Sequence, residues 1–395
     1  MTMALDGLRV LDFSRLLPGP YCTSLLADMG AEVIRIENPR ELAKQAKIFG
    51  WDSLSADGVR QRREQDMLAR NKRSVMLDIG NPAAQTLLRN MAATVDVVVE
   101  DYRPGVLAGL GLGYDDLARS NPRLVGCSLT LCGQTGPYRD KPGHDPIALA
   151  LSGVMARTGE DPGKPGFPGV PMADIVTGTH AAFGILAALR ARDRDGLGQH
   201  IDIAMTDCSM TLLANLVSRH RDLEALPPRG TRRADMGLWR CADGLYLCTT
   251  DMEPRYWLLF CETVGHPEFA SLQTDVAARP LIRRTLDEVM ATRPRSEWMA
   301  LMEAAGTQFA PVHTVAEAMA DAHVLARGMS VEVEGETGRP VRQLGLPVKL
   351  SRTPGAIRNL GGPPGDDTQD VLGTLGLGAE DLDRLRVAGA FGPVD

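Results

Sequence analysis

The first half of the chain alternates short apolar runs with stretches of helical periodicity. Residues 8–13 form an apolar run that ends in a Pro- and Gly-containing turn at 16–20, and residues 21–29 have the spacing of a helix. Gly30 ends that helix, and residues 31–36 form the next apolar run. A strand, a helix and a strand within about 30 residues are typical of a parallel α/β unit.

The same alternation continues along the chain. Further β-like runs follow at 74–78, 95–100 and 124–129, with helical stretches between them such as 82–93. This order predicts a doubly wound, Rossmann-like sheet. Residues 174–191 predict a long helix, and residues 200–204 predict another strand after a glycine-containing break.

The second half has a different composition. A Pro- and Arg-rich stretch at 226–233 predicts a linker. After it, a strand-like run near 244–249 and helical patterns around Tyr256 and Trp298 predict a second, smaller α/β domain. The tail from residue 345 is rich in Gly and Pro and contains one helical piece near 367–376.

Composition narrows the functional classes. The 395 residues are enough for two cores, and 44% hydrophobic with 24% charged residues is ordinary for a soluble protein. The net charge of -7 argues against a nucleic-acid-binding protein, which needs a basic surface. No apolar stretch has the length of a membrane span, and the N-terminus lacks the apolar core of a signal peptide. Seven cysteines without metal-ligand or disulfide spacing predict a cytoplasmic protein without structural metal.

The glycine-rich run at 109–113 resembles a dinucleotide fingerprint only in composition. A true fingerprint follows the first strand and has an acidic residue about 20 positions further on. Here the glycines follow Arg103-Pro104 and precede a helix start at Tyr114. A close-packed turn is the better interpretation, and we expect no nicotinamide or flavin cofactor.

Basic residues near the predicted strands are candidates for binding an anion. Arg103 follows the strand at 95–100, and strand ends of open α/β sheets are where ligands bind. An arginine in such a position can hold a phosphate bidentately. Arg70 and Arg73 form a second basic cluster before the strand at 74–78. For both clusters, ordinary surface arginines are an equally good interpretation.

Two acidic residues and one histidine are candidates for catalysis. Asp174 opens a predicted helix and can act as its N-cap, which is also the ordinary explanation of an aspartate there. His144 lies in a loop, where Asp145 could orient its ring, although most loop histidines are solvated bystanders. Glu253 precedes Pro254, and by itself it resembles a helix-start acid. The amides and dipole of a helix N-terminus should favour ionised Asp174.

Several motifs in order along nearly the whole chain resemble one known family, the family III coenzyme A (CoA) transferases, which also contain the α-methylacyl-CoA racemases. The matching segments are Leu5-Asp-Gly-Leu-Arg-Val-Leu-Asp12, Pro18-Gly-Pro20, Asp28-Met-Gly-Ala-Glu-Val-Ile-Arg35, Arg70-Asn-Lys-Arg-Ser74, Asp101-Tyr-Arg-Pro-Gly105, Gly133-Gln-Thr-Gly-Pro137, Gly143-His-Asp145, the Asp174 helix and Gly198-Gln-His-Ile-Asp202.

The resemblance implies an architecture. A large Rossmann-like domain would comprise 1–225 and 335–395, so that the C-terminal tail completes it. The small α/β domain would comprise 236–326, with linkers at 226–235 and 327–334. The resemblance further implies an interlocked homodimer. Its substrate would be a CoA thioester rather than a permanently bound cofactor, held by Leu16, Arg70, Asn71, Arg73 and Arg103.

The resemblance also implies two alternative reactions. In the transferases, the residue matching Asp174 is a nucleophile that forms an acyl anhydride and then an aspartyl-CoA thioester. In the racemases, Asp174 and His144 would exchange the α-proton of a 2-methylacyl-CoA through an enolate, and Glu253 would support the histidine.

Some residues favour the racemase reaction and others favour the transferase reaction. His144, the Glu253-Pro254 pair and Leu149-Ala150, which replaces the usual transferase Gln-Ala pair, favour the racemase. The segment 168–174 is closer to the transferases, and Pro146 and Ala148 depart from the racemase pattern. We therefore expect a racemase, with the transferase as the alternative.

Overall fold

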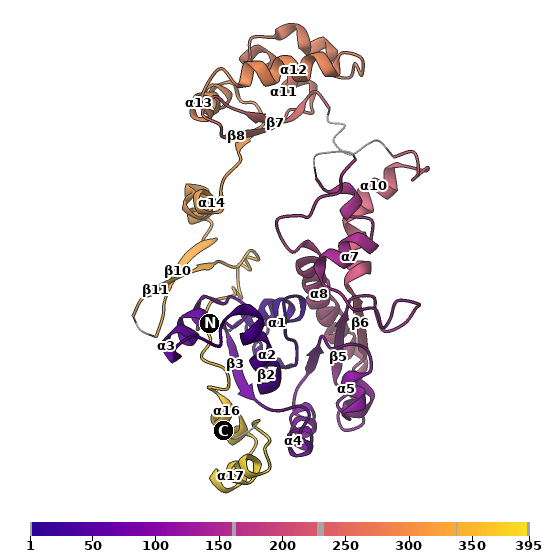
Figure 1. Cartoon of the computed structure of the whole chain (residues 1–395), viewed down its shortest axis with the longest axis vertical. Helices are drawn as coiled ribbons and strands as arrows, with labels where there is room; N and C mark the ends of the chain where they lie inside the picture. The colour runs from indigo at the N-terminus through magenta and orange to yellow at the C-terminus, as the bar shows by residue number, and fades with distance from the viewer. Residues whose placement is uncertain (1, 160–162, 227–232, 337, 393–395) are drawn as a thin grey trace. The chain divides into compact units, whose positions relative to one another are not determined.

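The computed structural model describes residues 2–159, 163–226, 233–336 and 338–392 (Figure 1). The chain divides into two compact units. The large unit contains Met1–Gly159, Gly163–Glu224 and Ala326–Asp395, and the small unit contains Ala225–Leu325. Each unit has its own hydrophobic core.

A six-stranded sheet in the order β3-β2-β1-β4-β5-β6 forms the centre of the large unit. All of its strand pairs are parallel. This is the doubly wound Rossmann order, with its reversal between β1 and β4, so the predicted sheet is confirmed. Its strands are β1 (Arg9–Asp12), β2 (Glu32–Glu37), β3 (Lys72–Met76), β4 (Val97–Glu100), β5 (Val125–Thr130) and β6 (His200–Ala204).

Helices connect these strands and cover the sheet (Figure 1). In the large unit they are α1 (Pro18–Asp28), α2 (Pro39–Phe49), α3 (Ala56–Gln65), α4 (Pro82–Ala92), α5 (Val106–Gly109), α6 (Tyr114–Ala118), α7 (Asp145–Leu151), α8 (Met172–Asp195), α9 (Met205–Met210), α10 (Ala214–Arg219), α16 (Thr368–Thr374) and α17 (Ala379–Val387). Short 3-10 turns occur at Met155–Arg157 and Thr211–Leu213.

Alternate strand residues enter two cores, one on each face of the sheet. Val10 and Val33 pack with α1 and α8 on one face, whereas Leu11 and Ile34 pack with α4, α16 and α17 on the other. Because both faces are covered, the strands read as continuous apolar runs in the sequence. A Cβ at Gly178 would lie 2.6 Å from the Pro18 carbonyl oxygen, so this glycine allows α8 to pack closely on α1.

The C-terminal tail is an integral part of the large unit. Asn71 adopts a left-handed conformation with φ of 61°, and its buried side chain links two segments far apart in sequence. Its amide donates to Asp28 at 2.7 Å and to the Ala356 carbonyl at 2.9 Å, and its oxygen accepts from the Arg358 N–H at 2.6 Å. Strands β10 (Ser330–Glu334) and β11 (Pro340–Leu344) form an antiparallel pair before this tail.

The small unit is built on a three-stranded antiparallel sheet in the order β7-β8-β9. Trp239, Trp257 and Trp298 dominate its core, and each indole N–H donates to an oxygen within the unit. The elements are β7 (Met236–Arg240), β8 (Tyr246–Thr250), α11 (Pro254–Thr263), a 3-10 turn (Pro267–Leu272), α12 (Arg279–Met290), α13 (Arg295–Ala305), β9 (Phe309–Pro311) and α14 (Val315–Ala320), followed by α15 (Ala322–Ala326).

Helix α8 is the one helix among the described residues that is long and apolar enough to cross a membrane by composition alone. Its residues Ala181, Ala182, Ile185 and Ala188 belong to the core beneath α1. A core helix of a soluble domain passes the same test of length and composition.

Candidate functional site

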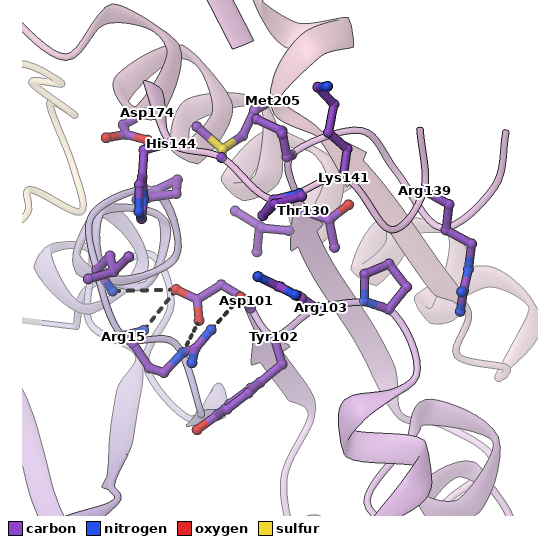
Figure 2. Close-up of a pocket in the computed structure, with 17 residues that line it drawn as sticks. Arg15, Asp101, Tyr102, Arg103, Thr130, Arg139, Lys141, His144, Asp174 and Met205 are labelled. Carbon is purple, nitrogen blue, oxygen red and sulfur yellow. Dashed lines mark hydrogen bonds and ion pairs between the residues drawn. The ribbon is translucent and has the colours of Figure 1, made fainter. Parts of the chain in front are cut away.

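A cavity of about 220 Å³ lies at the carboxyl edge of the sheet in the large unit (Figure 2). Segments that follow β1, β4, β5 and β6 line it, including Arg15 and Leu16 after β1 and Asp101 to Pro104 after β4. Because the strand order reverses between β1 and β4, this is the crevice where doubly wound sheets bind ligands. Asp174 and His144 both line this cavity.

Asp174 is the third residue of α8, and the N-cap position is held by Pro171. The expectation that Asp174 is the N-cap was therefore wrong by three positions. Its carboxylate is partly buried at the cavity wall and has no hydrogen-bond partner among the described residues. Asp174 thus faces the cavity without a competing interaction on its oxygens.

The carboxylate of Asp145 takes the place at the start of α8 that we expected for Asp174. Asp145 is buried, and its Oδ2 accepts from the N–H groups of Ala173 at 2.6 Å and Asp174 at 3.2 Å. The proposed orientation of His144 by Asp145 is therefore not seen. Asp145 positions the helix that carries Asp174, because its carboxylate binds two free amides of that helix.

This arrangement changes the acidity of Asp174. Burial raises the pKa of Asp174 to about 7, and the negative charges of Asp145 and Asp101 contribute to the rise. Our expectation of a favoured ionised form was wrong for a physical reason. The helix-start amides that would stabilise the Asp174 carboxylate are bound to Asp145 instead, and Asp145 adds a repelling charge.

His144 precedes α7 as its N-cap residue, in an extended backbone conformation. It is exposed, and its ring has no hydrogen-bond partner in the described part of the chain. Figure 2 shows its ring beside Asp174 at one end of the cavity. The position permits contact with a substrate, but no neighbouring group fixes the tautomer of the ring.

Arg15 and Asp101 form a network that the sequence reasoning missed (Figure 2). The Asp101 carboxylate accepts from the Arg15 backbone N–H at 2.8 Å and from its Nε at 3.0 Å. The Arg15 guanidinium also donates to Glu41 and stacks 3.8 Å from the centre of the Tyr102 ring. This network joins the segments after β1 and β4 at the wall of the cavity. Their position in the sequence was the available signal, because Asp101 directly follows β4 and Arg15 lies three residues after the end of β1.

The family model of CoA-transferase family III matches residues 5–368 of the chain. The chain belongs to CoA-transferase family III. It is 32% identical over 403 residues to the succinyl-CoA–L-malate CoA-transferase beta subunit of Chloroflexus aurantiacus, covering 98% of this chain and 97% of the relative. It is 33% identical over 363 residues to the succinate–glutarate CoA-transferase of Agrobacterium fabrum, covering 89% and 90%.

The fold agrees with this assignment. A CAIB/BAIF family protein from Brucella suis matches with a TM-score of 0.83 and 30% identity, covering 95% of this chain and 100% of that one. The chain is therefore an enzyme of CoA-transferase family III, whose transferases use CoA thioesters as substrates. The names of the relatives favour the transferase alternative over the racemase that we expected.

Two residues predicted to bind CoA lie at the cavity of this family III enzyme. Arg103 is exposed and makes no ion pair within the described residues, and Leu16 is 45% exposed. Arg139 and Lys141 from the loop after β5 line the same cavity. Their positive charges make the electrostatic potential at the rim of the cavity favourable for a phosphorylated ligand.

Arg70 and Asn71 do not line the cavity, and their contact with CoA stays a prediction that this cavity does not support. Arg70 is 3% exposed and binds Asp28 through Nε at 3.1 Å and Nη2 at 2.6 Å. Its Nη1 donates to the Leu344 carbonyl at 2.6 Å. Both residues attach the C-terminal tail to the sheet, because their polar groups are used by protein partners.

Arg73 and Glu253 are also placed away from the cavity lining. Arg73 lies on the edge strand β3 and makes ion pairs with Glu32 at 3.3 Å and Asp367 at 3.8 Å. Glu253 is exposed and is the N-cap residue of α11 in the small unit. The cavity lies wholly within the large unit. No group of three or more metal-ligating side chains occurs among the described residues.

Proposed function

We propose that this enzyme transfers CoA from an acyl-CoA thioester to a free carboxylic acid, with Asp174 as the nucleophile. The observation that carries the proposal is the Asp174 carboxylate, which faces the cavity without a hydrogen-bond partner among the described residues. A carboxylate that is poorly solvated and unpaired is more reactive toward a carbonyl carbon than one held by amides. The transferase names of the similar proteins support the same reaction.

The reaction balances with the groups present. An Asp174 oxygen attacks the thioester carbonyl, the carbon–sulfur bond breaks, and CoA leaves as a thiolate, so that a mixed anhydride of Asp174 and the acyl group remains. The thiolate then attacks the Asp174 carbonyl, which releases the donor acid and forms an aspartyl-CoA thioester. The acceptor carboxylate then attacks the aspartyl-CoA thioester, which releases the CoA thiolate and forms a second mixed anhydride. The thiolate attacks the acceptor's acyl carbon, so the new acyl-CoA leaves and Asp174 is free again. No net proton transfer is required, so no second base is needed.

The racemase is the second candidate, and one observation favours it: His144 lines the same cavity as Asp174. A two-base mechanism needs two groups of defined orientation on opposite faces of the α-carbon. The ring of His144 has no positioning partner in the described chain, because Asp145 binds the start of α8. This makes the racemase the weaker of the two proposals.

The two reactions are separated by a pair of variants. We expect succinyl-CoA and a free acid to exchange CoA, with loss of roughly a thousandfold or more in kcat for Asp174→Ala. Asp193→Ala, an exposed position on the same helix, is the matched control. His144→Ala should retain transfer, and hydroxylamine should trap an adduct on Asp174. Deuterium entering the α-carbon of a 2-methylacyl-CoA in D2O, without any CoA transfer, would overturn the transferase.

We also infer that Arg103 and Leu16 contact CoA. The Arg103 guanidinium, unpaired within the described residues, supports this role from its place at the cavity. Arg103→Met should weaken CoA binding in isothermal titration calorimetry by about fivefold or more, with a weaker salt dependence than the wild type. An unchanged affinity would exclude the contact.

The interlocked homodimer and the cytoplasmic location remain proposals that rest on the family resemblance. Light scattering coupled to gel filtration should give a mass of twice 42.6 kDa. A monomer at micromolar concentration would contradict the dimer. Cell fractionation of the untagged protein should recover it with the cytosol.

A further inference from the structure

A second cavity of about 410 Å³ adjoins the first one in the large unit. Arg15 and Leu16 line both cavities, so the two share a wall. The second cavity extends between α2 and α3, where it has a mainly apolar lining. Its apolar side chains are Leu16, Leu17, Leu42, Ala46, Phe49, Trp51, Leu54, Val59, Leu68 and Pro364.

The charges around this second cavity are unbalanced. Four arginines line it, at positions 15, 35, 62 and 63, against a single carboxylate, Asp66. Arg15 is bound to Asp101, and Arg63 is bound to Glu37. These two cations are therefore already neutralised by protein partners.

The other two arginines lack full compensation. Arg62 makes no ion pair or hydrogen bond within the described residues, and its guanidinium lies 3.2 Å from the centre of the Trp51 ring. Arg35 is 9% exposed and contacts Glu37 through Nε at 3.4 Å, whereas its Nη1 is buried without any hydrogen-bond partner in the described chain. A buried guanidinium with an unmade hydrogen bond is costly, and an anionic partner would offset that cost.

The pKa of Arg62 also indicates that this cation lacks a compensating anion. Burial lowers the pKa of Arg62, Asp66 opposes that effect, and the like charges of Arg63 and Arg35 lower the pKa further. Burial lowers the pKa of Arg35 as well, but the carboxylates of Glu37 and Asp12 outweigh that effect and raise it. Arg62 is therefore the cation of this group that has no ion-pair partner in the described chain. Stacking on Trp51 holds the Arg62 guanidinium in place, and an arginine fixed in this way is suited to bind a planar carboxylate.

We infer that the second cavity binds the remote carboxylate of a dicarboxylic acid or acyl group, with Arg62 as the specificity-determining residue. The apolar lining accommodates the methylene chain, and the shared wall at Arg15 and Leu16 leads to the cavity that holds Asp174. This inference rests on the proposed transferase function, since it assigns a class of substrate to that reaction. An apolar surface for a second protein would not require the unpaired cation of Arg62 beside a buried, unbonded nitrogen of Arg35.

The first test compares two acceptors of equal chain length, glutarate and pentanoate, with succinyl-CoA as the donor. In Arg62→Met, the ratio of kcat/KM for glutarate over that for pentanoate should fall roughly tenfold or more. Arg62→Lys keeps the charge but not the planar stack, so its ratio should fall less. Arg60→Met is the matched control, because Arg60 lies on the same helix and pairs with Glu336 outside the cavity. An unchanged ratio in folded Arg62→Met would overturn the inference.

The second test is independent of turnover. Glutarate and CoA are titrated separately into Asp174→Asn and into Asp174→Asn/Arg62→Met by calorimetry. Glutarate affinity should fall roughly tenfold or more in the double variant, with CoA affinity unchanged. If CoA affinity falls instead, the arginines hold phosphates and the inference is wrong. If glutarate binds as expected but the wild type transfers no CoA, the proposed function fails while this binding site stands.

Discussion

Replacing Asp174 by asparagine should stabilise the protein while abolishing its activity. Burial and the charges of Asp145 and Asp101 raise the pKa of Asp174 from 3.8 to about 7, so its ionised form is disfavoured in the folded state. The folded protein therefore binds more protons than the unfolded chain between about pH 4 and 7. The stability of the wild type falls as pH rises through this range. The Asp174→Asn variant carries no charge at this position, so it escapes this loss.

The magnitude follows from the size of the rise. The pKa of Asp174 rises from 3.8 to about 7, and each pKa unit corresponds to about 1.36 kcal/mol. The resulting loss of folding free energy at high pH therefore has an upper limit of roughly 4 kcal/mol. Because the carboxylate borders a cavity that is open to solvent, screening reduces this to about 2 kcal/mol. The free energy of unfolding in urea, followed by circular dichroism, should differ little between Asp174→Asn and wild type at about pH 4.5. The variant should be the more stable protein by about 2 kcal/mol at pH 8.

The matched control is Asp193→Asn, an exposed position on the same helix. It should change the free energy of unfolding by less than about 0.5 kcal/mol at both pH values. The reasoning is refuted if Asp174→Asn is less stable than the wild type at pH 8, or if the difference between the two proteins does not grow with pH.

Three further predictions concern Asp174, Asp145 and the ion pair between Arg70 and Asp28. In the wild type, kcat/KM for CoA transfer should rise with pH through about 7 and then level off, because the nucleophile must be ionised; a flat profile from about pH 5.5 to 8.5 would contradict this. Asp145→Asn keeps an acceptor for the α8 amides but removes a charge, so it should shift the midpoint of that pH profile downward with modest loss of stability. Arg70→Met removes the ion-pair partner of buried Asp28 and leaves it only the hydrogen bond from Asn71, so it should lower the free energy of unfolding by about 3 to 5 kcal/mol, an effect that the double variant with Asp28→Asn should partly reverse.

Local patterns were sufficient for most of the fold. The strand–helix–strand unit at 8–36 was predictable because each buried strand is a continuous apolar run, with turn residues between strand and helix. The helix that begins near Asp174 was also predictable, although it starts at Met172 and extends to Asp195. The second helix of the tail, α17, was missed, because its apolar positions contact the core only through a few residues such as Leu382.

The site was less predictable, because its contacts join residues distant in sequence. Asp145 binds amides 28 and 29 residues away, so its neighbour His144 was a misleading guide to its partner. Arg70 pairs with Asp28 and with a carbonyl 274 positions further on, and no spacing rule reveals such a contact. The preference for a racemase came from single residues near 144 and 253, whereas the relatives support a transferase.

Asp145 and Asp174 divide two tasks that one carboxylate could not perform together. A carboxylate that binds the free amides of a helix start is stabilised as an anion, and that same stabilisation makes it a poorer nucleophile. Asp145 takes the amides and fixes the start of α8, which leaves Asp174 at the cavity with a raised pKa. The aspartate of the Gly-His-Asp segment therefore has a role in a transferase that does not depend on the histidine before it. That role is to bind the start of α8, because the Asp145 carboxylate does not contact the ring of His144.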